Sequence, residues 1–294
     1  MSASTGVASG VPAPAPATGH VVLLRAGSSA ELPLLCVHAA GGDVSLYREL
    51  AGHLRPGPAI LGLCPPPGRG DGGGDREGDG GGDRGDGDGD GGGVERLARE
   101  HLAAIRAIQP HGPYRLLGEC SGGALAHEIA RRLEGSGERV SLLALFDGFP
   151  VWEPPLARAM PRHVYRGLHR GRIFANHLVN LVRLGPGTRG AYARSKAQRA
   201  RAALAARLGR PRPSSASDRA GLRAAFAGNH PVPFAGHAVL FRAARLPWGL
   251  RAGPDLGWAS LLGGLEIETI DGYFTTAISE PGVHALAERL SRYL

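Results

Sequence analysis

The segment with the clearest chemistry is Gly118-Glu119-Cys120-Ser121-Gly122. It lies between an apolar run and a segment with apolar residues at helical spacing, which is the context of a nucleophile elbow of the form G-x-nucleophile-x-G. Small flanking residues let the strand and the helix approach closely while the turn presents the central side chain. The pattern therefore predicts Cys120 as a nucleophile, with Gly118 and Gly122 shaping the elbow. A buried structural cysteine at a glycine-rich turn is the alternative.

The start of the following helix should favour negative charge at this elbow. We expect the positive end of the helix to lower the pKa of the Cys120 thiol and the backbone N–H of Ser121 to stabilise an oxyanion. A second N–H is expected from Ala39 or Ala40, in the glycine-rich loop after the first buried strand. His38, in the same loop, is better interpreted as a loop-shaping residue bonded to the backbone than as a base.

Asp147 is the candidate acid. It lies 27 residues beyond Cys120, at the end of the next predicted strand. Parallel strands end side by side at the carboxyl edge of a sheet, which would bring the two residues together. A polar cap at the strand end is the alternative for Asp147, while Asp255 is better explained as a turn and helix cap.

The elements around these residues alternate between strand and helix. Strands are predicted at 21–27, 32–37, 58–63, 114–119, 140–147, 237–241 and 265–270, and helices at 44–54, 94–109, 123–137 and 281–294. This order predicts an α/β fold with a mostly parallel sheet covered by helices on both faces. The basic segment at about 151–225 interrupts the alternation and is predicted to be an inserted helical lid.

Two segments are predicted to be disordered: the Ala/Pro-rich tail at 1–19 and a Gly/Asp-rich insertion at 68–93. The insertion lacks the aliphatic residue that each unit of a calcium-binding repeat needs, so a solvated loop is expected. No stretch is long enough for a membrane span, and the start does not resemble a secretory signal. Three cysteines without metal or redox spacing fit a reduced cytoplasm.

The net charge of +8 is unevenly distributed. Residues 151–223 carry 16 basic side chains against two acidic ones, which indicates an acidic partner or ligand. The segment has few interleaved aromatic residues and no recognised nucleic-acid-binding motif, so nucleic acid is not favoured. An acidic carrier protein and a phosphate-bearing substrate arm both fit, and the charge does not distinguish them.

These motifs resemble the thioesterase domains of nonribosomal peptide and polyketide synthases. The likeness rests on LPLLCVHAAGGDVSLYRELAGHL, GPYRLLGECSGGALAHEIARRLEGSGERVSLLALFD, DLGWASL and EPGVHALAERL, and it covers residues 20–294 apart from the insertion, with the lid only loosely matched. It implies an α/β-hydrolase fold that takes an acyl chain from the phosphopantetheine thiol of an acyl or peptidyl carrier protein, in secondary metabolism such as antibiotic biosynthesis. It implies no cofactor and no metal.

On that pattern Cys120 occupies the usual serine position and Asp147 the position of the triad acid, with Ala39, Ala40 and Ser121 at the oxyanion hole. The third triad member departs from the family. Its closing segment reads G-D-H-x-x-M-L-x-E-P-x-V, and an ungapped match to residues 272–283 places Phe274 at the histidine. Several residues could replace the missing histidine. Tyr273 is a poor base, His284 lies on the polar face of the last helix, and His127 is better explained by packing. The predicted lid adds three more histidines: His163, His169 and His177.

The combination of Cys120 and Phe274 predicts an enzyme that is loaded readily but hydrolyses its acyl-enzyme slowly, because a thiolate needs no base to accept an acyl group whereas attacking water does. We therefore expect the acyl chain to be released from Cys120 by cyclisation, by acyl transfer or by slow hydrolysis. Since the chain begins with Met and shows no carrier segment, we expect a free-standing enzyme. The alternatives are a catalytically degenerate binding or scaffold protein, and a fold repurposed for a non-acyl reaction such as cyclisation.

Overall fold

The computed structural model describes residues 21–65, 93–150, 162–183, 189–190, 193–194, 197, 222, 224–226, 229–246, 252–274 and 277–294. The described strands form one sheet in the order β1-β3-β2-β4-β5-β6-β7. Their bounds are β1 Val21–Arg25, β2 Leu34–Val37, β3 Ile60–Leu63, β4 Tyr114–Glu119, β5 Val140–Phe146, β6 Phe234–Arg245 and β7 Leu262–Tyr273. Only the edge strand β1 runs antiparallel to its neighbour in this sheet. The predicted α/β fold with a mostly parallel sheet is confirmed.

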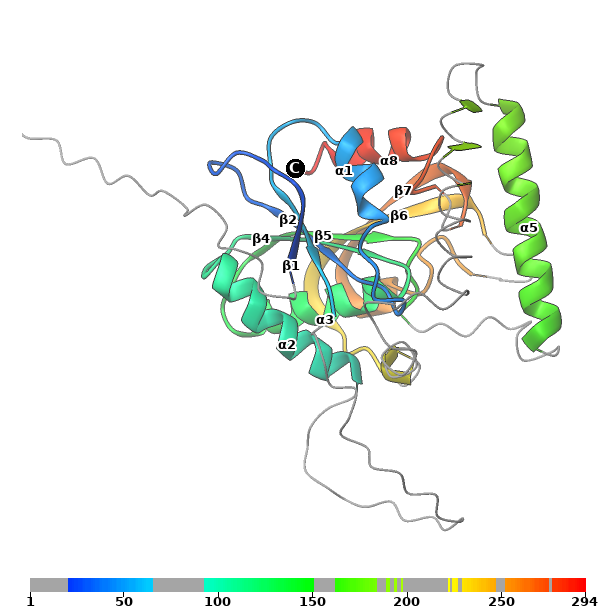
Figure 1. Ribbon diagram of the computed structural model, residues 1–294. Helices are drawn as coiled ribbons and strands as arrows, with labels where there is room; N and C mark the ends of the chain where they lie inside the picture. Colours follow the sequence, from blue (N-terminus) through cyan, green and yellow to red (C-terminus); the bar gives the residue numbers. More distant parts are fainter. Residues whose placement is uncertain are drawn as a thin grey trace, which may run out of the picture.

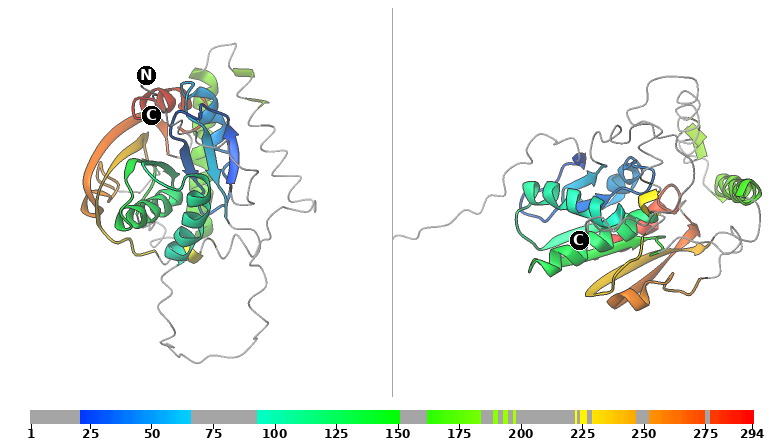
Figure 2. Two further views of the ribbon diagram at one scale, coloured as in Figure 1. Left: turned by 90° about the vertical axis from the view of Figure 1, so that its left-hand side faces the viewer. Right: turned by 90° about the horizontal axis from the view of Figure 1, so that it is seen from below.

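The helices cover both faces of the sheet. Their bounds are α1 Tyr47–His53, α2 Gly93–Ile108, α3 Ser121–Gly135, α5 Arg162–Arg183 and α8 Val283–Leu290, with a short 3-10 helix η1 at Ala259–Leu261. Helices α2 and α3 lie on one face, and α1 and α8 lie together on the other (Figure 1; Figure 2 gives two further views). Parallel strands need such double cover because both of their faces are apolar.

Alternation along the strands creates the two apolar layers. In β2, Leu34 packs on the side of α1 and α8, while its neighbour Leu35 packs on the side of α2 and α3. In β4, Leu116 packs on the side of α2 and α3 and Leu117 on the side of α1 and α8, because successive side chains of a strand point to opposite faces. The sheet is therefore a rigid central layer that fixes the carboxyl ends of β2, β4 and β5.

Helix α5 lies outside these layers, beside the sheet (Figure 1). It carries exposed apolar side chains, among them Phe174 and Val182, and supplies the best-described part of the segment predicted as a lid. Most of residues 151–225, the whole tail 1–19 and all of the insertion 68–93 except Gly93 lie outside the described residues. Gly93 is the first residue of α2, so the helix begins one residue earlier than predicted.

Within the part of the chain that the structure describes, none of the helices combines the length and the apolar character that a membrane crossing requires.

Candidate active site

Cys120 sits at the sharp turn between β4 and α3. Its backbone has φ 52° and ψ −123°, a conformation that is costly for a residue with a side chain and that persists where surrounding structure enforces it. The Cys120 N–H donates to the Phe146 carbonyl at 2.9 Å, and its carbonyl accepts from Gly123 N–H at 3.1 Å. The turn therefore has the strained geometry that a nucleophile elbow requires.

The two flanking glycines are required by close backbone approach. A Cβ atom on Gly122 would lie 2.8 Å from the Val37 carbonyl oxygen and 2.9 Å from that of His38, and one on Gly118 would overlap the Gly122 carbonyl. No real Cβ tolerates such contacts with backbone atoms. The structural reason predicted for Gly118 and Gly122 is thus present: β4, α3 and the loop after β2 meet too closely for side chains.

Asp147 follows β5 and is fully buried. Glu119 of β4 is in register with Phe146 of β5, so Cys120 and Asp147 each come one residue after the end of paired strands. Asp147 also has a positive φ, 46°, and its carboxylate accepts a hydrogen bond from the Ala243 N–H at 2.6 Å. The carboxylate is consequently anchored to β6, beside the elbow.

The acid–base setting of Cys120 differs from the expectation drawn from the helix start. Burial, followed by the charge of Glu119, raises the pKa of the Cys120 thiol, and the favourable backbone hydrogen bond from Ser121 does not offset this. The predicted lowering of the pKa is wrong because Cys120 is half-buried between the elements around the elbow, and this loss of solvent disfavours the thiolate. The resting form of Cys120 at neutral pH is the thiol.

Glu119 is the functional candidate that the sequence analysis passed over. Burial, and secondarily the charge of Asp147, raises the pKa of its carboxyl to about 8. Its N–H donates to the Tyr47 hydroxyl at 2.8 Å, which in turn donates to the Val37 carbonyl at 2.8 Å. Glu119 stands inside the elbow motif itself, so its charge was a visible signal, whereas nothing in the sequence pointed to Tyr47.

The loop after β2 closes over the elbow. The Ala40 N–H donates to Ser121 Oγ at 2.8 Å. Of the two N–H groups predicted for the oxyanion hole, that of Ala40 therefore already has an acceptor, and that of Ala39 is the other candidate. His38 is buried, and its Nδ1 lies 2.8 Å from the Ala39 carbonyl oxygen. Burial lowers the pKa of His38 to about 4. Its predicted bond to the backbone is confirmed, and its neutral ring shapes the loop.

Phe274 comes directly after β7 and is buried. Its N–H donates to the Arg245 carbonyl at 2.8 Å, and its ring packs against Phe149, with ring centroids 5.7 Å apart. Phe149 lies two residues beyond Asp147. The ring of Phe274 therefore packs against a residue that is close to Asp147 in the sequence.

The other side chains weighed from the sequence lie elsewhere. His127 is buried against Phe234 and Trp258, so the predicted packing role is confirmed. His284 is exposed at the start of α8 and pairs with Glu280. The Asp255 carboxylate accepts from the Ala259 N–H at 3.2 Å, which is the predicted cap. Tyr273 is buried, and the side chains of His163, His169 and His177 lie outside the described residues.

Comparison with known proteins identifies the relatives of this chain. Residues 84–160, which contain the elbow and Asp147, match the thioesterase domain family. Malpibaldin synthetase of Mortierella alpina is 36% identical over 115 residues, which is 39% of this chain and 2% of that protein. Enterobactin synthase component F of Escherichia coli K12 is 30% identical over 156 residues, 52% of this chain and 11% of that protein. The chain thus spans a small part of the length of these relatives.

A solved structure agrees in fold. The thioesterase domain of NocB, in covalent complex with a fluorophosphonate nocardicin G analogue, superimposes with a TM-score of 0.56 at 21% identity, covering 90% of this chain and 94% of that domain. The strand order, the elbow at the end of β4 and the sequence matches all lead to one assignment. Residues 84–160 thus match the thioesterase domain family, parts of the chain are similar in sequence to nonribosomal peptide and polyketide synthases, and the fold is that of a solved thioesterase domain.

Proposed function

We propose that this protein takes an acyl chain from a carrier-protein thioester onto Cys120 and releases it by cyclisation, acyl transfer or slow hydrolysis. The observation that carries the proposal is the strained backbone of Cys120, at φ 52°, at the tip of β4. Such strain at a site beside a buried carboxylate is typical of nucleophile elbows. Asp147, Ala39, Ala40, Ser121, Gly118 and Gly122 take the roles predicted for them.

Loading exchanges one thioester for another. The Cys120 sulfur bonds to the substrate carbonyl carbon, the bond from that carbon to the pantetheine sulfur breaks, and the thiol proton of Cys120 leaves with the released pantetheine thiol. Because the Cys120 pKa is raised, the thiolate is scarce at neutral pH, and loading should be slower than the helix start suggested. The Ser121 N–H, with Ala39 or Ala40, would stabilise the oxyanion in between.

Among the residues that the structure describes, no histidine is evident as a base for deacylation by water. Phe274 stands at the histidine in the family's sequence pattern, and a general base commonly contributes about 10²- to 10⁴-fold to such a step. The acyl-enzyme should therefore persist until an amine, hydroxyl, thiol or carbanion of the substrate or of a second molecule attacks it.

The carrier protein is proposed to approach over the basic segment. Arg170 and Arg172 of α5 are exposed, and acidic partners associate faster with such a surface. The phosphate of the pantetheine arm is a second group that arginines recognise well. Nucleic acid and membrane are not proposed as partners.

The decisive test is intact-protein mass spectrometry after incubation with a panel of acyl-pantetheine thioesters. Wild type should gain the mass of one acyl group, Cys120→Ala none, and Cys120→Ser little or none because its hydroxyl lacks a base. An adduct of equal yield on Cys120→Ala would overturn Cys120 as the nucleophile. Absence of an adduct and of turnover with every donor would overturn the acyl-processing function.

A second candidate function is favoured by one observation. Phe274 is buried and packs against Phe149, so the residue that the sequence pattern aligns with the histidine is part of the packed interior. This suits a binding or scaffold protein that has kept the fold after losing catalysis. The same mass-spectrometric experiment separates the two candidates, since a scaffold protein would form no acyl adduct.

A further inference from the structure

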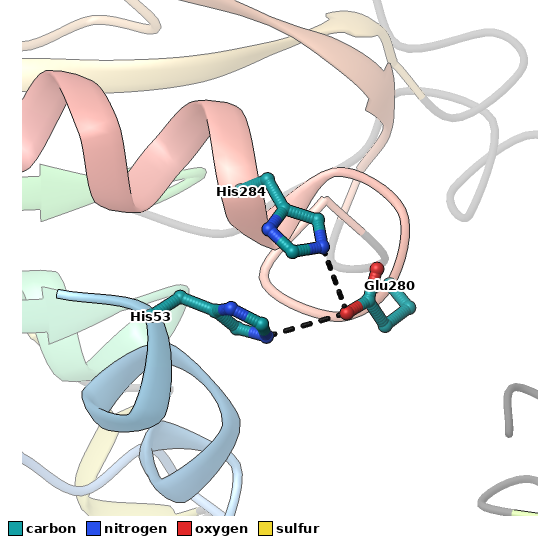
Figure 3. Close-up of side chains that lie close together, drawn as sticks. All are labelled: His53, Glu280 and His284. Carbon is teal, nitrogen blue, oxygen red and sulfur yellow. Dashed lines mark ion pairs between the residues drawn. The ribbon is translucent and has the colours of Figure 1, made fainter. Parts of the chain in front are cut away.

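Two histidines and a glutamate converge on the face of the molecule that α1 and α8 cover. His53 ends α1, Glu280 lies in the loop before α8, and His284 is in the first turn of α8 (Figure 3). The Nε2 atoms of His53 and His284 lie 3.2 and 3.0 Å from the same oxygen, Oε1 of Glu280. The three candidate ligand atoms all lie within 4.8 Å of one another.

We propose that His53, Glu280 and His284 form a binding site for a divalent transition-metal ion such as Zn²⁺ or Ni²⁺. Two imidazoles with one carboxylate suit these borderline ions better than Mg²⁺ or Ca²⁺, which prefer oxygen ligands. Bonds of about 2.0–2.2 Å to a shared ion place neighbouring ligand atoms about 3–3.5 Å apart. The observed nitrogen–oxygen distances already match, so little movement of the side chains is needed.

The two rings pack closely. The centroids of His53 and His284 lie 4.1 Å apart, so a single ion can reach both Nε2 atoms. One divalent ion satisfies both nitrogens through their lone pairs while each ring keeps its proton on Nδ1. Binding would release any proton held on either Nε2 atom, and it changes no oxidation state.

The ligands are held by ordered elements. The Glu280 N–H donates to Oε1 of Glu49 at 2.8 Å, which ties the loop to α1. Tyr47 and Leu50 of α1 and Leu286 of α8 belong to one buried cluster, so the helices that carry the histidines are fixed against each other. A site built on such elements needs little ordering when it binds an ion.

The site is open to solvent. The side chains of His53 and His284 are 32% and 59% exposed, so an ion can enter directly and water can complete its coordination. The carboxylates of Glu280 and Glu49 supply the negative charge that attracts a cation. The affinity should be modest, in the micromolar range of Kd, because only three protein ligands hold the ion at the surface.

Metal binding would strengthen the folded state. The ligands come from distant parts of the sequence and are brought together only by folding, so the ion binds the native chain far better than the unfolded one, and stability rises with ion concentration. Glu280 follows Phe274 by six residues in the sequence, so the ion would also hold a residue that is close in sequence to the candidate active site. The proposal does not depend on the acyl chemistry of Cys120.

The test is isothermal titration of Zn²⁺ and Ni²⁺ into the full-length, tag-free protein after treatment with a chelator. One ion per chain should bind wild type, and affinity should fall at least tenfold in the double variant His53→Ala/His284→Ala and in Glu280→Gln. His111→Ala is the matched control, because His111 also pairs with a glutamate, Glu138, on the surface. It should bind as wild type does, and Mg²⁺ should not bind at this site.

Two further measurements test whether a loss of binding comes from misfolding of a variant and whether the ion binds at histidines elsewhere in the chain. Co²⁺ bound to wild type should give visible absorption bands that the double variant lacks, and Zn²⁺ should raise the thermal midpoint of wild type but not of that variant. Circular dichroism without metal should be the same for all of them. Equal binding by wild type and the double variant, or no binding by wild type, would overturn the site.

Discussion

The backbone N–H of Ala40 donates a hydrogen bond to Ser121 Oγ at 2.8 Å, which links the loop after β2 to the first residue of α3. Both residues are candidates for the oxyanion hole. The hydroxyl of Ser121 therefore competes with a substrate oxyanion for one of the donors that would stabilise it.

Replacing Ser121 by alanine should release the Ala40 N–H. We expect loading of Cys120 by an acyl-pantetheine thioester to become several-fold faster, while the free energy of unfolding falls by about 1 kcal/mol for the lost hydrogen bond. Stopped-time mass spectrometry and urea unfolding measure the two effects. Ser121→Thr keeps the hydroxyl and should load at the wild-type rate. Slower loading of Ser121→Ala would show that Ala40 does not act in the hole.

Substituting histidine for Phe274 should create the missing base. The acyl-enzyme of Phe274→His is expected to hydrolyse about 10²-fold faster than that of wild type, since a positioned base contributes this much or more. The decay of the acyl adduct gives the rate. Phe274→Leu, which disturbs the same packing without adding a base, should load and decay as wild type does. Equal decay of both variants would place Phe274 outside the reacting geometry.

Glu119 should make stability depend on pH. Its pKa is raised to about 8 from an ordinary value of 4.5, so the folded chain holds a proton that the unfolded chain has lost between these pH values. Stability from this group is complete below about pH 4.5 and is lost as the pH rises through 8. Relative to Glu119→Gln, wild type should lose up to about 1.4 kcal/mol per pH unit in this window.

Urea unfolding at pH 5.5, 6.5 and 7.5 would measure that difference. Glu288→Gln, which removes an exposed carboxylate of α8, is the control, and its difference from wild type should change little over the same range. A difference for Glu119→Gln that is independent of pH would mean that Glu119 ionises as an ordinary surface carboxyl group does.

Alanine at Gly122 should disrupt the elbow. The added Cβ would press on the backbone carbonyls of Val37 and His38, so we expect a loss of about 2–3 kcal/mol in the free energy of unfolding and loss of acyl loading. Gly135→Ala, in the same helix with no atom within 4 Å of the new Cβ, should be neutral or slightly stabilising. Retention of full stability and loading by Gly122→Ala would contradict the close approach described for this turn.

Reversing two charges on α5 should weaken the use of a carrier protein. We expect Arg170→Glu/Arg172→Glu to raise the KM for a carrier-bound acyl thioester several-fold, most strongly at low salt, with little change for a small acyl-pantetheine thioester. Arg48→Glu, an exposed arginine of α1, is the control. Equal loss with both kinds of substrate would show that the arginines act on the fold or on the pantetheine arm.

The sequence was most informative where the cause of structure is local. The short apolar runs predicted the strands, and the short spacing between Cys120 and Asp147 allowed only one helix and one strand between them. Their positions at the ends of the paired strands β4 and β5 follow from parallel topology. The elbow glycines were predictable for the same reason, because a strand-to-helix turn restricts its own neighbours.

Long-range burial was not predictable from these patterns. The sign of the Cys120 pKa shift depends on how completely other elements enclose the thiol, and the helix start suggested the opposite direction. The bond between Ala40 and Ser121 joins residues 81 positions apart, and the group of His53, Glu280 and His284 joins two helices from opposite ends of the described chain. No spacing rule relates such residues.

The pairing of α1 with α8 also has a consequence for biosynthesis. Residues Leu34, Leu117 and Phe146 form strand faces that α1 covers only in part, and Val283, Leu286 and Leu290 of α8 complete the same buried cluster. A ribosome makes α8 after all seven described strands, so this apolar face stays uncovered while the nascent chain emerges. The growing polypeptide is therefore exposed to aggregation until its last helix is synthesised, and a premature stop codon before Val283 would make that exposure permanent.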